Sequence, residues 1–194
     1  MSTTPMTMIP VRRSPARAVA ADLLDSQPVE PTIRAAADSD IDAIHRLVSE
    51  HVTEGHLLPR SREEIASRVH RFLVATDGEE IVACADLAPL SRKVAEVRSM
   101  VVAHEARSRG ICRRMVQELE RRALSAGFET LCAFTHAPGY FVRLGFSIVP
   151  HVWLPEKIEA DCRTCAQFRQ CGQYAVMLPL VHAPAGRVAE SAHA

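Results

Sequence analysis

Aromatic side chains are scarce in this sequence, at 5% of 194 residues, and neither sign of charge is in excess, because 23 Lys and Arg balance 23 Asp and Glu. A nucleic-acid-binding domain usually carries a basic excess, and one that stacks bases needs exposed aromatic rings. No apolar run approaches the ~18 residues of a membrane-spanning helix. From these absences we expect that the protein binds neither nucleic acid nor a membrane.

We expect no secretory leader, because no apolar segment precedes a small-residue cleavage site near the N-terminus. Residues 1–21 contain arginine, serine and threonine but no acid. This composition is faintly like an organellar transit peptide, but a disordered extension is its commoner explanation. We therefore expect a cytoplasmic protein whose six cysteines are thiols or metal ligands rather than disulfides.

The chain is expected to have three parts: a disordered extension over residues 1–30, one domain over residues 31–180, and a flexible tail over residues 181–194. A domain of this length buries roughly two-thirds of its unfolded surface, so it needs no disulfide or metal to fold.

Hydrophobic periodicity predicts strands and helices in mixed order along this domain. The predicted strands are residues 32–35, 72–75, 81–85, 96–102, 131–135 and 174–178. The predicted helices are one capped by Asp38 and running to Val52, one opened by Ser61 and Glu64 and running to Val69, and two over residues 110–126 and 138–144. The order predicts an α/β fold with a mixed sheet and without the strict alternation of a Rossmann fold.

A basic turn lies between the predicted strand 96–102 and the helix that begins at Gly110. Free N–H groups and the dipole at a helix start favour an anion there. Arg107, Arg109 and Arg113 add positive charge where a phosphate would lie. From the residues alone, a turn whose arginines are solvated is the simpler interpretation.

The run Arg107-Ser108-Arg109-Gly110-Ile111-Cys112 resembles the R/Q-x-x-G-x-G/A signature of the GNAT acetyltransferases. The resemblance implies a mixed, mostly antiparallel sheet flanked by helices in a single domain, and a loop that holds the pyrophosphate of acetyl-CoA. The residues that it assigns to acetyl-CoA are Met100, Val101, Val102, Arg107, Ser108, Arg109, Gly110, Ile111, Cys112 and Arg113.

Two positions depart from the family pattern. Cys112 stands where the family usually has Gly or Ala, and a thiol at a helix start is expected to have a lowered pKa unless a bound pyrophosphate opposes it. Many members also carry a Tyr four residues before the closing Gly145-Phe146 pair. Phe141 occupies that position and Tyr140 lies one step off, so the commonest general acid of the family is missing.

Residues 95–180 resemble the acetyltransferase domain of bacterial N-acetylglutamate synthases more closely, and that family also has Phe at the position of Phe141. The matching segments are residues 95–102, 133–135, 140–146 and 154–157. The resemblance implies a short, stand-alone enzyme that acetylates L-glutamate with acetyl-CoA, the first step of arginine biosynthesis, without requiring a metal. It leaves arginine feedback and a homodimer open.

The same resemblance places Glu96 where these synthases have their proposed general base. Arg98 lies on the same strand face and either binds a substrate carboxylate or pairs with Glu96. Thr135 is the candidate donor of a proton to the CoA thiolate, and Lys157 a second carboxylate anchor. Taken alone, these residues are also typical of a solvated strand Glu, a buried β-branched residue and a surface Lys.

Cys162, Cys165 and Cys171 are spaced so that their thiolates could hold a structural metal, with His151 as a fourth ligand. Reduced thiols or a reversible disulfide are the alternatives. Two other functions remain open: a GNAT enzyme for another amine, such as a different amino acid, a polyamine, a drug or a protein N-terminus, and a non-catalytic acyl-CoA-binding domain.

Overall fold

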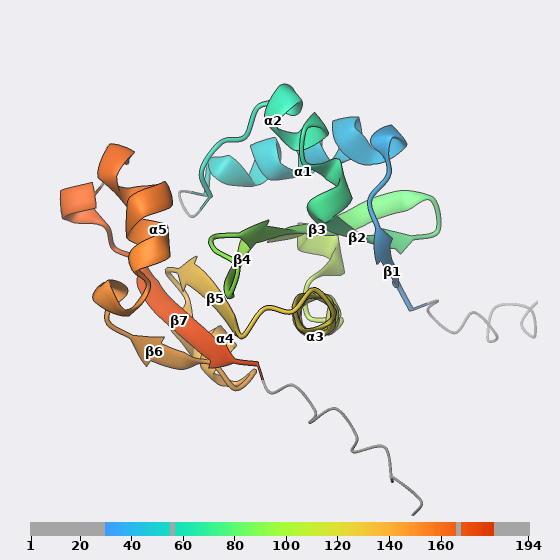
Figure 1. The fold of residues 1–194 in the computed structure, drawn as a ribbon. Coiled ribbons are helices and arrows are strands. Elements are labelled where there is room, and N and C mark those ends of the chain that lie inside the picture. The colour runs from blue at the N-terminus through green and yellow to red at the C-terminus, as the bar shows by residue number, and fades with distance from the viewer. Residues whose placement is uncertain (1–29, 55–56, 166–167, 181–194) are drawn as a thin grey trace, which may run out of the picture. The chain divides into compact units, whose positions relative to one another are not determined.

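The computed structural model describes residues 30–54, 57–165 and 168–180. The predicted extension, apart from Glu30, and the predicted tail lie outside the described residues. Within them the chain forms one sheet of seven strands in the order β1-β2-β3-β4-β5-β7-β6, with helices on both faces (Figure 1). No helix in this described part has the length and apolar character needed to cross a membrane.

The sheet is mixed and mostly antiparallel, as predicted. Strands β4 and β5 pair in parallel, and the other neighbouring strands pair antiparallel. Six of the strands fall where hydrophobic alternation predicts them. The seventh, β6, was missed because it has three residues at the sheet edge, two of them exposed, and so carries no periodic pattern. The strands are β1 (Thr32–Ala35), β2 (Phe72–Asp77), β3 (Glu80–Pro89), β4 (Val94–Val102), β5 (Thr130–Thr135), β6 (Ser147–Val149) and β7 (Tyr174–Pro179).

Helices α1 and α2 lie over one face of β2 to β4, and α3 lies over the opposite face (Figure 1). The apolar stripe of α1 buries Ile44 and Val48 completely, and that of α3 buries Met115 and Leu119. These stripes and the strands between them form the main core. The helices are α1 (Ile41–Val52), α2 (Arg62–Ala66), α3 (Ile111–Ser125), α4 (Pro138–Val142) and α5 (Pro155–Ala160).

The predicted N-cap of the first helix is wrong. Asp38 begins a 3-10 turn, Asp38–Asp40, and α1 follows from Ile41. Arg34 of β1 binds the Asp40 carboxylate with two N–H groups, at 2.6 and 3.0 Å, and the Ala37 N–H donates to it at 2.8 Å. Asp40 therefore ties the edge strand to the helix start, which spacing along the sequence did not reveal.

The second predicted helix begins as expected and ends early. The Ser61 hydroxyl accepts a hydrogen bond from the Glu64 N–H at 3.1 Å, the predicted N-cap contact. The helix stops at Ala66, and Val69 lies in a separate 3-10 turn, Val69–Arg71. Helix α5 was not predicted at all, because its six residues between a proline and a cysteine-rich loop are too few for a periodic signal.

Strands β4 and β5 run together over a short distance and then separate. Their pairing extends from Val94 with Thr130 to Val97 with Ala133. Beyond that point β4 pairs with β3, and β5 pairs with β7. A register shift between Cys84 and Asp86, with Ser99 at φ +47°, bends β4 there. The second half of β4 thus has no strand partner on its β5 side within the described chain.

Candidate active site

A cleft of about 800 Å³ opens where β4 and β5 separate. Its walls are β4 from Glu96 on, the loop before α3 with the start of that helix, the end of β5, helix α4 and one side chain of α5. His51 at the end of α1 and Glu54 just after it also line the cleft. It collects all the side chains assigned from the sequence to acetyl-CoA, substrate and catalysis except one, Arg109. Those lining it are Glu96, Arg98, Met100, Val101, Val102, Arg107, Ser108, Gly110, Ile111, Cys112, Arg113, Thr135 and Lys157.

The loop before α3 is shaped as an anion site. Ser108 and Gly110 have positive φ, +65° and +74°, which turn the backbone sharply before the helix starts at Ile111. No side chain caps this helix start, so its first N–H groups are available to a ligand at the cleft. A Cβ on Gly110 would meet no atom within 4 Å. The backbone angle, rather than crowding, is therefore what requires glycine there.

The three arginines of this loop have different positions. Arg107 lines the cleft, donates to both oxygens of Glu54 at 3.2 and 3.3 Å, and also reaches the Val102 carbonyl. Arg113 is exposed and lines the cleft. Arg109 instead pairs with Asp77 of β2 and does not line the cleft. Arg107 and Arg113 are thus the better placed of the three for a phosphate.

The expected low pKa of Cys112 is wrong. Burial raises the pKa of this thiol, and a hydrogen bond with the Tyr140 side chain offsets only part of that effect. Burial and the same contact also raise the pKa of Tyr140. Tyr140 therefore presents a protonated hydroxyl beside Cys112 at the start of α3. Its neighbour Phe141 occupies the position, four residues before Gly145, where many family members have the tyrosine. Phe141 is buried, with its ring 5.2 Å from that of Phe146.

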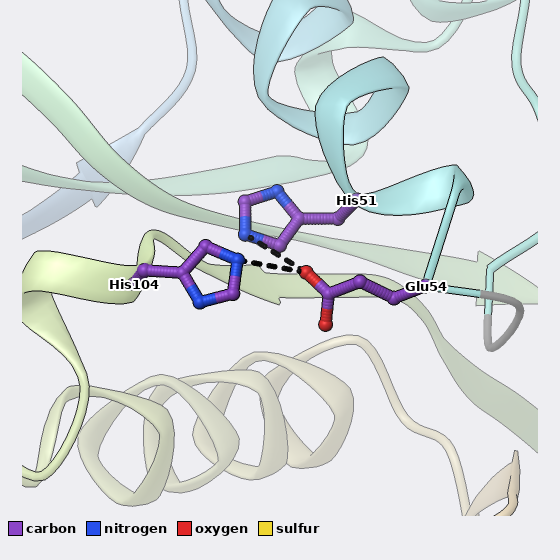
Figure 2. A group of neighbouring side chains, drawn as sticks. All are labelled: His51, Glu54 and His104. Atoms are coloured by element: carbon purple, nitrogen blue, oxygen red, sulfur yellow. Dashed lines mark ion pairs between the residues drawn. The ribbon is translucent and has the colours of Figure 1, made fainter.

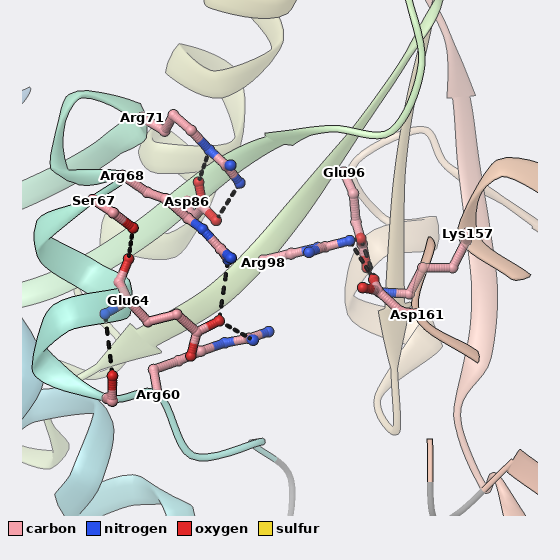
Figure 3. Close-up of polar contacts among 11 residues, drawn as sticks. Arg60, Glu64, Ser67, Arg68, Arg71, Asp86, Glu96, Arg98, Lys157 and Asp161 are labelled. Carbon is pink, nitrogen blue, oxygen red and sulfur yellow. Dashed lines mark hydrogen bonds and ion pairs between the residues drawn. The ribbon is translucent and has the colours of Figure 1, made fainter. Parts of the chain in front are cut away.

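Glu96 is the centre of a charged cluster at the β5 end of the cleft (Figure 3). It is 2% exposed and accepts hydrogen bonds from Arg98 Nε and from Lys157 Nζ, the latter at 2.7 and 2.9 Å. Asp161, just after α5, binds both cations, with Lys157 Nζ at 2.9 Å. Two carboxylates and two cations thus alternate around one point. Glu96 is not a solvated strand residue, and Lys157 is not a surface lysine, because α5 carries it inward.

The cluster favours the charged forms of Arg98 and Asp161. Burial alone would lower the pKa of Arg98, but the nearby Glu96 and Asp161 carboxylates outweigh it and raise the pKa. Burial would raise the pKa of Asp161, and the hydrogen bond from Lys157 instead brings it below its usual value. Sequence reasoning missed Asp161. The available signal was its position four residues after Lys157, the spacing of an ion pair on one helix face.

Thr135 lies at the end of β5, where the cleft opens. Its hydroxyl oxygen accepts a hydrogen bond from the Ala137 N–H at 3.0 Å. A hydroxyl that accepts there still has its own proton to donate. The position therefore suits a donor to an atom in the cleft.

The three cysteines near the C-terminal end do not bring three ligand atoms within 4.8 Å of one another in the described residues, so a metal site there stays a prediction. Cys162, Cys165 and Cys171 are free thiols. His151, the suggested fourth ligand, contacts the Gln173 carbonyl at 3.0 Å. Within residues 30–54, 57–165 and 168–180, the three metal-ligating side chains that converge are His51, Glu54 and His104 (Figure 2).

Comparisons with known proteins agree with this geometry. The model of the acetyltransferase (GNAT) family matches residues 41–146. An uncharacterized N-acetyltransferase of Chlorobaculum tepidum is 31% identical over 148 residues, which cover 76% of this chain and 96% of that protein. An amino-acid acetyltransferase of Pasteurella multocida is 29% identical over 128 residues, 65% of this chain. The chain spans only 29% of that longer relative.

Among solved structures, an N-acetylglutamate synthase from Neisseria gonorrhoeae, complexed with coenzyme A and N-acetyl-glutamate, superimposes with a TM-score of 0.71. The two sequences are 23% identical over 78% of this chain and 35% of that one, so this likeness concerns the fold. The family match and the Chlorobaculum relative establish more. This chain belongs to the acetyltransferase (GNAT) family and is an N-acetyltransferase.

Proposed function

We propose that this enzyme acetylates the α-amino group of L-glutamate, as the cytoplasmic first step of arginine biosynthesis. The observation that carries the proposal is the pair of cations, Arg98 and Lys157, in the wall of the cleft beside the proposed base Glu96. Their outer partner, Asp161, is 39% exposed at its side chain. A substrate carboxylate that displaces Asp161 would find two hydrogen-bonding cations already in place.

Acetyl-CoA is proposed to bind across the other half of the cleft. Its pyrophosphate would lie against the uncapped start of α3, with Arg107 and Arg113 beside it. The pantetheine arm would follow the side of β4 that lacks a strand partner, pairing with backbone groups of Met100 and Val102. This course leads the thioester toward the point where Glu96 and Thr135 face the cleft.

The reaction then removes two protons from the substrate nitrogen and delivers one to the CoA sulfur, so one proton is released to water in each turnover. The substrate ammonium loses a proton through a water molecule to Glu96, because Arg98 and Lys157 already occupy the carboxylate oxygens. The neutral amine attacks the thioester carbonyl carbon and forms the N–C bond. When the tetrahedral intermediate collapses, the C–S bond breaks and the thiolate takes a proton from Thr135. The nitrogen gives up its second proton to water, which returns a proton to the Thr135 hydroxyl, and Glu96 releases the proton it took to solvent.

The acceptor is tested by steady-state kinetics with acetyl-CoA and a panel of amines, following the release of free thiol. L-glutamate should give the highest kcat/KM among glutamate, glutamine, aspartate and a polyamine. A Lys157→Met variant should raise the KM for glutamate at least about tenfold, since it removes one carboxylate contact. Lys93→Met is the matched control, because Lys93 pairs with Glu129 outside the cleft. A higher kcat/KM for another amine in the panel would replace glutamate as the acceptor.

A further inference from the structure

A second group of polar side chains lies near Arg107, and none of its members belongs to the Glu96 cluster (Figure 2). His51 lies in the last turn of α1, Glu54 follows the helix, and His104 begins the 3-10 turn His104–Ala106 after β4. Glu54 Oε1 is 3.0 Å from His104 Nε2 and 3.6 Å from His51 Nε2. One ligand atom from each residue lies within 4.8 Å of the other two.

His51 is held in a single orientation with one nitrogen unused. The residue is 6% exposed, and its Nδ1 lies 2.8 Å from the Leu47 carbonyl oxygen. A carbonyl only accepts, so Nδ1 carries a proton, and in the neutral ring Nε2 keeps the lone pair. Nε2 is buried and has no hydrogen-bond partner. A buried polar atom without a partner costs free energy, so this nitrogen calls for a ligand.

We propose that His51, Glu54 and His104 bind a divalent transition-metal ion. We expect this ion to be Zn²⁺, because imidazole and carboxylate groups are among its usual ligands. Donor atoms around tetrahedral zinc lie about 3.3 Å apart, given bonds of about 2.0 to 2.1 Å. The two distances to Glu54 Oε1, 3.0 and 3.6 Å, bracket that value. The His51 and His104 rings are stacked, with 5.0 Å between their centroids and 20° between their planes, so the exposed His104 ring must turn for its Nε2 lone pair to point at an ion in the plane of the His51 ring. The contact of His51 Nδ1 with a backbone carbonyl is the usual support of a metal-ligating histidine.

Arg107 is the neighbouring cation that the ion must tolerate. Its Nη2 lies 3.2 Å from Oε1 and 3.3 Å from Oε2 of Glu54. Once the ion holds Oε1, the guanidinium keeps Oε2 and acts as the outer partner of a ligating carboxylate. The charge of Arg107 weakens binding relative to an isolated site of the same ligands.

The ion would link two parts of the fold rather than take part in acetyl transfer. His51 and Glu54 belong to the end of α1, whereas His104 precedes the loop that leads into α3. Binding to the folded state alone stabilises that state, so zinc should raise the melting temperature. The proposal does not depend on the identity of the acceptor, because none of its three ligands belongs to the Glu96 cluster.

The test titrates the metal-stripped full chain with ZnCl₂ in a calorimeter, in a Cys162→Ser/Cys165→Ser/Cys171→Ser background that removes the thiolates of the other candidate metal site. One ion per chain should bind and raise the melting temperature. His104→Ala should weaken binding at least about tenfold. The His104 side chain is 66% exposed, so its loss should leave the apo melting temperature unchanged.

His70→Ala is the matched control, another exposed histidine in a 3-10 turn, and should bind zinc as before. A Co²⁺ derivative should lack thiolate-to-metal charge-transfer absorption, which a cysteine site would show. Absence of zinc uptake, or uptake that His104→Ala leaves unchanged, would overturn the proposal.

Discussion

At the scale of single residues, Glu96 has two candidate roles, as the general base and as the partner that holds Arg98 in place. Alternation along β4 places Glu96 and Arg98 on one strand face, and both line the cleft. Burial between two cations makes Glu96 part of an organised cluster as well as a candidate base. The two roles predict different kinetics, so they are separable.

Glu96→Gln should lower kcat by about 100-fold or more, because the amide has the same size without the proton affinity that a general base supplies. The KM for acetyl-CoA should hardly change, since the proposed phosphate contacts lie in residues 107–113. Raising the pH should partly restore kcat, because more of the substrate amine is then already neutral. Steady-state kinetics from about pH 6 to about pH 10 measure this, spanning the range in which the amine loses its proton.

If Glu96 only holds Arg98 in place, the variant would instead raise the KM for glutamate and leave kcat within about threefold of wild type. Arg98→Ala would then reproduce that pattern. Such a result would end the candidacy of Glu96 as the base. Circular dichroism on each variant checks that the buried cluster still folds, since Asp161 remains to neutralise the cations.

Only a weak signal in the sequence indicated Asp161, its spacing from Lys157, and none indicated the arrangement of Tyr140 and Phe141. Asp161 follows a six-residue helix whose existence depends on packing between distant parts of the chain. Tyr140 and Phe141 are adjacent on a helix of five residues. Both line the cleft, and the packing of Phe141 against Phe146, a tertiary contact, leaves the Tyr140 hydroxyl beside Cys112.

At the scale of elements, the helix start at Gly110 joins the sheet to the proposed cosubstrate. Local signals predicted the strand before it, the helix after it and the glycine between them. The positive φ of Ser108 was not predictable, because no sequence rule places a serine in that region. Likewise, the separation of β4 from β5 depends on pairing between strands far apart in the chain.

Gly110→Ala should cost about 1 kcal/mol in the free energy of unfolding, because alanine is strained at φ +74°. It should also raise the KM for acetyl-CoA several-fold, since relief of the strain re-aims the N–H groups at the helix start. Urea unfolding and steady-state kinetics measure the two effects.

Gly78→Ala is the matched control, because Gly78 has φ +60° in the β2–β3 turn and equally open surroundings. It should lower stability by a similar amount and leave the KM for acetyl-CoA unchanged. Equal KM values for the two variants would separate this helix start from cosubstrate binding.

At the scale of the whole molecule, acid stability should depend on the Arg34–Asp40 pair that ties β1 to the start of α1. The hydrogen bond from Arg34 is the main cause that lowers the pKa of Asp40. A carboxyl with a lowered folded-state pKa stabilises the fold above its unfolded value, near 3.8, and this contribution is lost as pH falls through the folded-state pKa.

Asp40→Asn should therefore reduce the free energy of unfolding by about 1 to 3 kcal/mol near neutral pH, the range for hydrogen bonds to charged groups. The difference from wild type should shrink below pH 3.8. Urea unfolding across this range measures it. Asp42→Asn is the control, because its pair with Arg62 is solvent-exposed and should contribute little. A constant difference at all pH values would assign the effect of Asp40→Asn to packing instead of charge.

The separation of β4 from β5 has a consequence for the sheet as a whole. Strands β1 to β4 form one half-sheet and β5 to β7 another, and four residue pairs join them. A pantetheine arm bound along β4 would take the place of a neighbouring strand. It would displace the water that otherwise hydrogen-bonds to the backbone groups on that side of β4. Each turnover would then dry and rewet an interior sheet edge. The turnover rate, kcat, would then depend partly on how fast water rehydrates these backbone groups as CoA leaves.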